Sequence, residues 1–346
     1  MRLLAPALAL ALSACATLPS DRTYTNPVLD QDFPDPAIVR SADGSFQVYA
    51  TQGGDPVRNI QVARSEDLVS WTLVGDALPV KPSWASKTQD FWAPDVYRRS
   101  DTYYLYYSAK PDAALTDQSR GLCLAVATSK SAAGPFTDKG EPLLCGPSFV
   151  NIDPFVFDDP ATGKTLLYWG SGFGPIKVQE LSSDLLSFAP LSKPIDLVDV
   201  VRTEDPREYR RLVEGAWVIL RNGWYYLFFS GDNCCGPRAH YATMVARSRS
   251  ATGPFEVRDR PLYLVVEANE RWNAVGHNSV ITDDAGQDWI LYHGVDRQRP
   301  RSKPTDDVNT RRVMLLDRLV WRHGWPEVAG RSPTSTAQSA PVVRRR

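Results

Sequence analysis

Short apolar segments recur along the chain, and each is opened by one polar or ionisable residue. The segments are rich in β-branched and aromatic side chains, as in Phe46–Thr51 and Trp224–Ser230, and Gly, Asp or Asn turns separate them. This pattern predicts short β-strands, and no stretch keeps a 3.6-residue apolar period long enough for a substantial helix. The five openings, spaced 58 to 63 residues apart, are Asp35, Asp95, Asp153, Glu214 and His277.

The nearly equal spacing indicates five copies of one unit of three or four strands. A single unit of this kind cannot bury both of its faces, so the units stack around a common axis. The sequence therefore predicts an all-β, five-bladed β-propeller over residues 26–330. A pair of β-sandwiches is the alternative, but it does not explain five similar intervals. Residues 331–346 are rich in Ser, Thr, Pro and Arg and are expected to form a disordered tail.

The first residues have the features of an export signal. Met1-Arg2 is a short positive start, Leu3–Leu12 is apolar but too short to span a membrane, and Ser13-Ala14-Cys15 follows. This arrangement resembles the bacterial lipoprotein cleavage box, which implies a signal peptide over 1–14, a lipid on Cys15 and a linker over 15–25. The alternative is an ordinary secretory signal with a chance cysteine. Both predict export, and the first predicts an anchor at the bacterial cell envelope.

Four further cysteines suit an oxidising compartment. Cys123 and Cys145 could pair across one unit, whereas the adjacent Cys234 and Cys235 pair either with each other or with separate partners. Three connectivities therefore stay open. Metal binding is the weaker interpretation, because no Cys or His spacing typical of a zinc site occurs.

Charge and composition narrow the partners. The net charge of −1 gives no basic face for nucleic acid. The 10 Trp, 14 Tyr and 12 Phe residues suit β-sheet cores, and their flat apolar faces also suit sugar rings. We expect a monomer that binds carbohydrate and contacts a membrane only through its lipid.

The openings also predict a site. The innermost strands of a propeller begin together at one face, so the residues that open them can converge on one pocket. Any single aspartate there could simply bond the N–H groups of a turn, and Asp95 fits that alternative. The convergence of Asp35, Asp153 and Glu214 indicates a catalytic site. Neighbouring carboxylates make each other's ionisation energetically unfavourable, so they rarely gather for structural reasons alone.

Four motifs carry a family resemblance. Phe33-Pro-Asp35-Pro, Asn151-Ile-Asp153-Pro and Val213-Glu214-Gly-Ala resemble the acidic motifs of glycoside hydrolase family 43, and Phe91-Trp92-Ala-Pro-Asp95-Val resembles its second-blade signature. The resemblance covers Asn26 to Val328. It implies a five-bladed propeller of the inverting enzymes that act on arabinose- and xylose-containing polysaccharides.

The resemblance also implies roles. Asp35 is the general base, Glu214 the general acid, and Asp153 raises the pKa of the acid and orients it. Inversion requires the base and the acid to stand roughly 6.5–9.5 Å apart, which leaves room for the attacking water. A nearby carboxylate can keep Glu214 protonated at neutral pH through like-charge repulsion.

Further candidates surround these carboxylates. Phe33 and Trp92 offer apolar faces to a sugar, with core packing as the alternative, and Arg312 could bond sugar hydroxyls or be a solvated charge. His277 could contact the sugar or a calcium ion near the site; the alternative is a hydrogen-bonded core histidine, and no cofactor is required.

The expected activity is release of L-arabinofuranose from arabinan or arabinoxylan, as an α-L-arabinofuranosidase or exo-arabinanase. A β-xylosidase or an endo-1,5-α-L-arabinanase is the alternative within the family. A non-catalytic carbohydrate-binding propeller is the alternative from another class, because a fold alone does not imply an activity.

Overall fold

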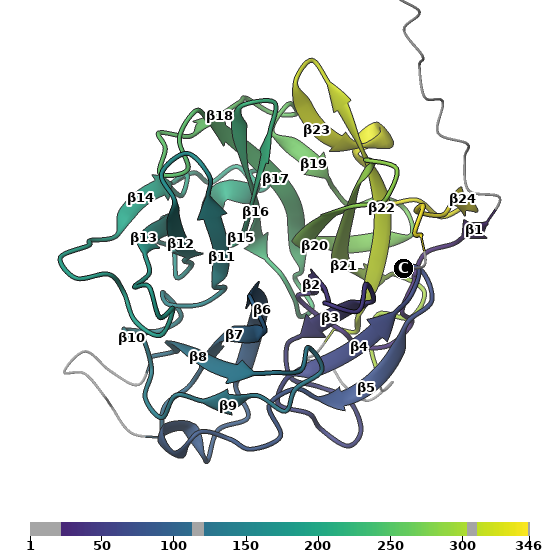
Figure 1. Ribbon diagram of the computed structural model, residues 1–346. Coiled ribbons are helices and arrows are strands. Elements are labelled where there is room, and N and C mark those ends of the chain that lie inside the picture. Colours follow the sequence, from purple (N-terminus) through teal and green to yellow (C-terminus); the bar gives the residue numbers. More distant parts are fainter. Residues whose placement is uncertain (1–21, 113–120, 303–309, 345–346) are drawn as a thin grey trace, which may run out of the picture.

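Five antiparallel sheets surround a common axis in the computed structural model, which describes residues 22–112, 121–302 and 310–344 (Figure 1). The predicted five-bladed β-propeller is confirmed. The helices of the described residues are short 3-10 turns: η1 (Ser83–Ala85), η2 (Tyr209–Arg211) and η3 (Ala329–Arg331). In that part of the chain, no helix has the length and apolar character needed to cross a membrane.

Each blade follows the chain from the axis outward. Blade 1 holds β2 (Ala37–Arg40), β3 (Phe46–Ala50), β4 (Gln61–Ser65) and β5 (Thr72–Asp76). Blade 2 holds β6 (Phe91–Arg99), β7 (Thr102–Ala109) and β8 (Cys123–Ser129), with β9 (Thr137–Asp138) and β10 (Leu144–Cys145) both paired to β8. Blade 3 holds β11 (Phe155–Asp159), β12 (Lys164–Trp169), β13 (Ile176–Glu180) and β14 (Ile195–Val198).

Blades 4 and 5 complete the ring. Blade 4 holds β15 (Val213–Arg221), β16 (Trp224–Asn233) and β17 (His240–Ser248), with β18 (Glu256–Val257) and β19 (Leu264–Val266) both paired to β17. Blade 5 holds β20 (Trp272–Thr282), β21 (Asp288–Asp296), β22 (Arg312–Arg322) and β23 (Trp325–Val328).

Turn chemistry fixes the hairpins within the blades. Asn222 and Gly223 join β15 to β16 with φ of 50° and 72°, and positive φ at both central residues is the requirement of a type I′ turn. The backbone twist of such a turn matches that of the paired strands, so it sets their register.

Five apolar cores lie between neighbouring blades. The core between blades 1 and 2 contains Tyr49 and Tyr107, and the core between blades 4 and 5 contains Trp272 and Tyr292, all four fully buried. Each blade thus buries both faces, which explains why strands such as β3 are buried throughout. Truncating one of these rings to Ala should cost about 3–5 kcal/mol.

The two ends of the described chain close the ring. The segment before β2 runs along β22, where the Val28 N–H donates to the Met314 carbonyl at 3.0 Å and the Phe33 N–H donates to the Arg312 carbonyl at 2.7 Å. β1 (Thr23–Tyr24) pairs with β24 (Gln338–Ser339). The predicted disordered tail is therefore wrong for residues 331–344, because its backbone is paired and Ala340 is buried.

Two disulfides resolve the open cysteine pairing. One joins Cys123 to Cys145 within blade 2, and the other joins the neighbours Cys234 and Cys235. The predicted signal peptide and the lipidated Cys15 lie outside the described residues.

Candidate active site

In each blade a residue of positive φ lies in the innermost strand or up to two residues before it, at the same end of the axis. In three blades the strand register shifts across this residue, which makes it a β-bulge. Bulges of this kind re-aim side chains next to active sites. The five residues are Asp35 (61°), Ala93 (45°), Asp153 (60°), Gly215 (64°) and His277 (51°).

This register differs from the predicted one in two blades. Ala93, not Asp95, is the counterpart of Asp35 in blade 2, and Glu214 stands one residue before its bulge. The spacing of about 60 residues was correct, but a shift of one position reverses the face that a side chain takes, and a shift of two positions moves it further along the strand.

A ring of hydrogen bonds links these residues from blade to blade. In four blades the N–H of the positive-φ residue donates to a side chain at the end of the second strand of the preceding blade. The bonds are Ala93 N–H to Thr51 Oγ1 at 2.8 Å, Asp153 N–H to Ser108 Oγ at 3.2 Å, His277 N–H to Ser230 Oγ at 2.8 Å, and Asp35 N–H to His293 Nδ1 at 3.2 Å. The bonds hold the catalytic ends of neighbouring blades in one arrangement.

Asp35 is buried in a cationic setting. Its Oδ1 accepts a hydrogen bond from Arg312 Nη1 at 2.9 Å and lies 3.4 Å from His277 Nδ1, while Thr51 Oγ1 donates to its Oδ2 at 2.5 Å. Burial raises its pKa, but the charge of Arg312 and the contacts of His277 and His293 outweigh burial and hold the pKa well below its usual value. Asp35 is therefore ionised at neutral pH, which is the state that a general base needs.

The pKa values of Asp153 and Glu214 are shifted in the opposite direction from that of Asp35. Burial raises the pKa of both carboxyls, and the charges of Glu214 and Asp35 raise that of Asp153 further. Two hydroxyls hold the Glu214 carboxyl: Ser171 Oγ donates to Oε2 at 2.7 Å and Tyr241 Oη donates to Oε1 at 2.8 Å. The pair keeps a proton to higher pH than isolated carboxyls would, which suits a general acid.

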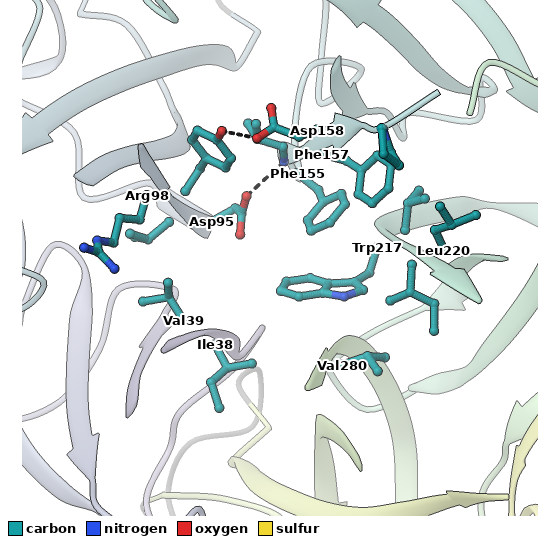
Figure 2. Close-up of a pocket in the computed structure, with 16 residues that line it drawn as sticks. Ile38, Val39, Asp95, Arg98, Phe155, Phe157, Asp158, Trp217, Leu220 and Val280 are labelled. Carbon is teal, nitrogen blue, oxygen red and sulfur yellow. Dashed lines mark hydrogen bonds between the residues drawn. The ribbon is translucent and has the colours of Figure 1, made fainter. Parts of the chain in front are cut away.

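A cavity of about 570 Å³ lies further along the axis, lined by the innermost strand of every blade (Figure 2). Trp217 and Val280 line it. Trp217 lies three positions after Glu214, and Val280 lies three positions after His277, about 10 Å further along the strand in each case. Asp95 faces this cavity and accepts a hydrogen bond from the Val156 N–H at 2.9 Å. The expectation that all five openings point to one pocket is wrong for Asp95.

The family follows from a comparison with known sequences. The family model described as glycosyl hydrolases family 43 matches residues 24–326. The chain belongs to glycoside hydrolase family 43. As a member of this family, the protein is a glycosidase, as the sequence motifs predicted.

Several relatives cover nearly the whole chain. The extracellular exo-α-(1→5)-L-arabinofuranosidase ArbA of Cellvibrio japonicus is 27% identical over 319 residues, which are 86% of each chain. A β-D-galactofuranosidase of Aspergillus niger is 30% identical over 325 residues, covering 88% of this chain and 84% of that protein. The solved structure of an α-L-arabinanase of Cellvibrio cellulosa aligns with a TM-score of 0.68 at 26% identity, covering 86% of this chain and 95% of the other.

The other predicted sugar-binding residues of this family 43 chain differ in their surroundings. Trp92 is part-exposed and pairs in register with Ser108 at the catalytic end, so its predicted contact with a sugar stays open. Phe33 as a sugar platform is wrong, because its ring is fully buried in the core between blades 5 and 1. Arg312 reaches Asp35, so in this structure it pairs with the predicted base.

The predicted calcium ion at His277 does not fit the side chains around it. Calcium takes six to eight oxygen ligands. His277 Nδ1 lies 3.4 Å from Asp35 Oδ1 and 3.7 Å from Asp153 Oδ2, and the described residues contain no group of three or more His, Cys, Asp or Glu side chains placed to hold a metal. No step of the mechanism below uses a metal.

Four residues that contact the catalytic carboxyls were not predicted: Thr51, Ser171, Tyr241 and His293. Thr51 and His293 close the second strands of blades 1 and 5, in the same place as Ser108 and Ser230. The sequence could have revealed them, because a polar residue ends the second strand of these blades with the same spacing as the openings. Tyr241 belongs to a third strand and carries no signal of this kind.

Proposed function

We propose that this family 43 glycosidase is an exported, lipid-anchored monomer that releases L-arabinofuranose from arabinan or arabinoxylan by inversion. The observation that carries the proposal is electrostatic: Asp35 is held ionised beside Arg312, while burial keeps a proton on the Asp153–Glu214 pair. One site thus holds an available base and an available acid. The names of the Cellvibrio relatives support arabinose as the sugar.

The mechanism divides the work between the two carboxyls. Asp35 accepts a proton from a water molecule while the water oxygen attacks the anomeric carbon. The bond from that carbon to the leaving oxygen breaks with its electron pair, and Glu214 gives its proton to that oxygen. Asp153 accepts a hydrogen bond from the Gly215 N–H at 3.0 Å, and this contact fixes the peptide next to Glu214.

Hydrolysis of a small panel tests the proposal. The substrates are the p-nitrophenyl derivatives of α-L-arabinofuranoside, β-D-xyloside and β-D-galactofuranoside, together with linear arabinan, for wild type, Asp35→Ala and Glu214→Ala. We expect arabinose release by wild type and, on linear arabinan, whose leaving oxygen needs a proton, a loss of 10²-fold or more in both variants. The Aspergillus relative makes β-D-galactofuranoside the second candidate substrate. Cleavage of that substrate alone would leave the proposed mechanism in place and replace arabinose by galactofuranose as the sugar released. No turnover by wild type would favour a binding protein.

The anchor needs its own experiment. Metabolic labelling with a fatty acid should mark the wild-type protein and not Cys15→Ser. A labelled Cys15→Ser protein, or an unlabelled wild type, would contradict lipidation at Cys15.

A further inference from the structure

An aromatic pair, made of the exposed Phe173 and the half-buried Phe149, lies on two loops attached to the catalytic residues. Phe173 is 63% exposed, and its ring meets that of Phe149 edge to face, with centroids 5.9 Å apart and an angle of 68° between the planes. A ring this exposed contributes little to a core, and exposed apolar groups that lie together mark binding surfaces more often than single ones do. Neither residue belongs to the apolar clusters of the described chain.

The chain places this pair next to the reacting carboxyls. Phe149 stands four residues before Asp153. Phe173 stands two residues after Ser171, whose hydroxyl donates to Glu214 Oε2 at 2.7 Å. Both loops therefore begin or end at residues that hold the predicted acid, and the pair lies on the same end of the axis as the site.

The two loops are fixed to each other. The Gly170 N–H donates to the Ile152 carbonyl at 3.0 Å. A Cβ on Gly172 would lie 2.6 Å from Val150 Cγ1 and 3.0 Å from Val150 Cα, so only glycine permits this close approach. The first loop is also tied to β8, because the Leu122 N–H donates to the Ser148 carbonyl at 2.7 Å and Cys145 is disulfide-bonded to Cys123.

We propose that Phe149 and Phe173 form a platform for the sugar unit on the leaving-group side of the cleaved bond, the next unit of the same glycan chain. The inference rests on the proposed function and extends it to a substrate of at least two units. A furanose ring presents C–H groups on one face, and these pack on an aromatic face that is already held in place. The adjacent Ser171–Glu214 bond makes the platform the neighbour of the oxygen that Glu214 protonates.

The test compares substrates that differ only beyond the first sugar. Wild type, Phe173→Ala and Phe149→Ala are assayed on methyl α-L-arabinofuranoside, which has no second sugar, and on linear arabinohexaose. The platform predicts that Phe173→Ala lowers kcat/KM on the hexaose about tenfold and on the methyl glycoside less than twofold. Phe173→Trp, which keeps an aromatic face, should retain most of the activity on the hexaose.

Leu191→Ala is the matched control, because Leu191 is fully exposed and lies on the same blade between β13 and β14. It should change neither rate. Equal losses on both substrates, or no loss on the hexaose, would overturn the platform while the proposed function stands. A wild type that cleaves neither substrate would contradict the proposed function and, with it, the sugar as occupant.

Discussion

The Gly215 N–H donates a hydrogen bond to Asp153 Oδ2 at 3.0 Å. It is the exception in the ring of bonds between blades, since the N–H groups of the other four positive-φ residues reach a side chain at the end of a second strand. In blade 3 that position is Gly170, which has no side chain. The carboxylate of Asp153 takes its place, and this binds the predicted pKa modulator to the peptide that follows the predicted acid.

Asp153→Asn and Asp153→Ala should separate the two effects of this residue. Asn can still accept from the Gly215 N–H but removes the charge that opposes ionisation of Glu214. We expect the basic limb of the pH–rate profile to move to lower pH in Asp153→Asn, since the pKa of Glu214 falls. Asp153→Ala should add a further loss of kcat because it also releases the peptide. An unchanged basic limb in Asp153→Asn would contradict the electrostatic role.

Thr51 should tune the base. Its hydroxyl donates to Asp35 Oδ2 at 2.5 Å and accepts from the Ala93 N–H at 2.8 Å. A hydrogen bond to a charged group contributes about 1.5–3 kcal/mol, so Thr51→Val should raise the pKa of Asp35 and move the acidic limb of the pH–rate profile upward by about one to two pH units.

Thr51→Ser keeps the hydroxyl and is the matched control, which should leave the acidic limb in place. Thr51→Val also leaves the Ala93 N–H without its partner, so its Tm should be measured alongside. A fall in Tm with an unshifted acidic limb would assign Thr51 to structure alone.

Tyr241 should tune the acid in the opposite direction from Asp153. Its hydroxyl donates to Glu214 Oε1 at 2.8 Å and lowers the pKa of that carboxyl, while its ring stacks on His293 at 5.7 Å. Tyr241→Phe keeps the ring and removes the donor, so the pKa of Glu214 rises and the basic limb moves to higher pH. Ser171→Ala removes the other donor and should act in the same direction. A shift to lower pH in either variant would refute this assignment.

Asp95 should affect stability and not catalysis. Burial raises its pKa from 3.8 to about 7, so the folded protein favours the neutral carboxyl. The stability that this provides is complete below about pH 4 and is lost as the pH rises through 7, by about 4 kcal/mol in all. Asp95→Asn, which can still accept from the Val156 N–H, should remove this decline. Unfolding in urea at pH 4 and pH 8 checks it, and an equally steep decline in the variant would show that other groups cause it.

The fold was predictable because its signal is distributed over the whole chain. Five openings at a spacing of about 60 residues, with strand endings that repeat in step, leave few arrangements other than a ring of blades. Asp35, Asp153 and Glu214 could be found because they carry this repeat and the family motifs together. Their mutual approach follows from the topology.

The rest depended on details that a repeat does not encode. A β-bulge shifts the register by one or two residues, and this turned Asp95 away from the site and placed Ala93 in the ring. Phe33 shows the same limit, since burial of an aromatic ring depends on the neighbouring blade. The tail over 331–344 is polar in composition, yet it is ordered by pairing with β1, a contact between opposite ends of the chain.

The stereochemistry of the first product tests the central claim most directly. ¹H NMR of the anomeric region, recorded during the first minutes of hydrolysis of an α-L-arabinofuranoside, distinguishes the anomer released by the enzyme from the one formed later by mutarotation. An ionised Asp35 that activates water opposite a protonated Glu214 predicts β-L-arabinofuranose as the initial product. Initial release of the α-anomer would mean retention through a covalent intermediate and would contradict the assigned roles of both carboxyls.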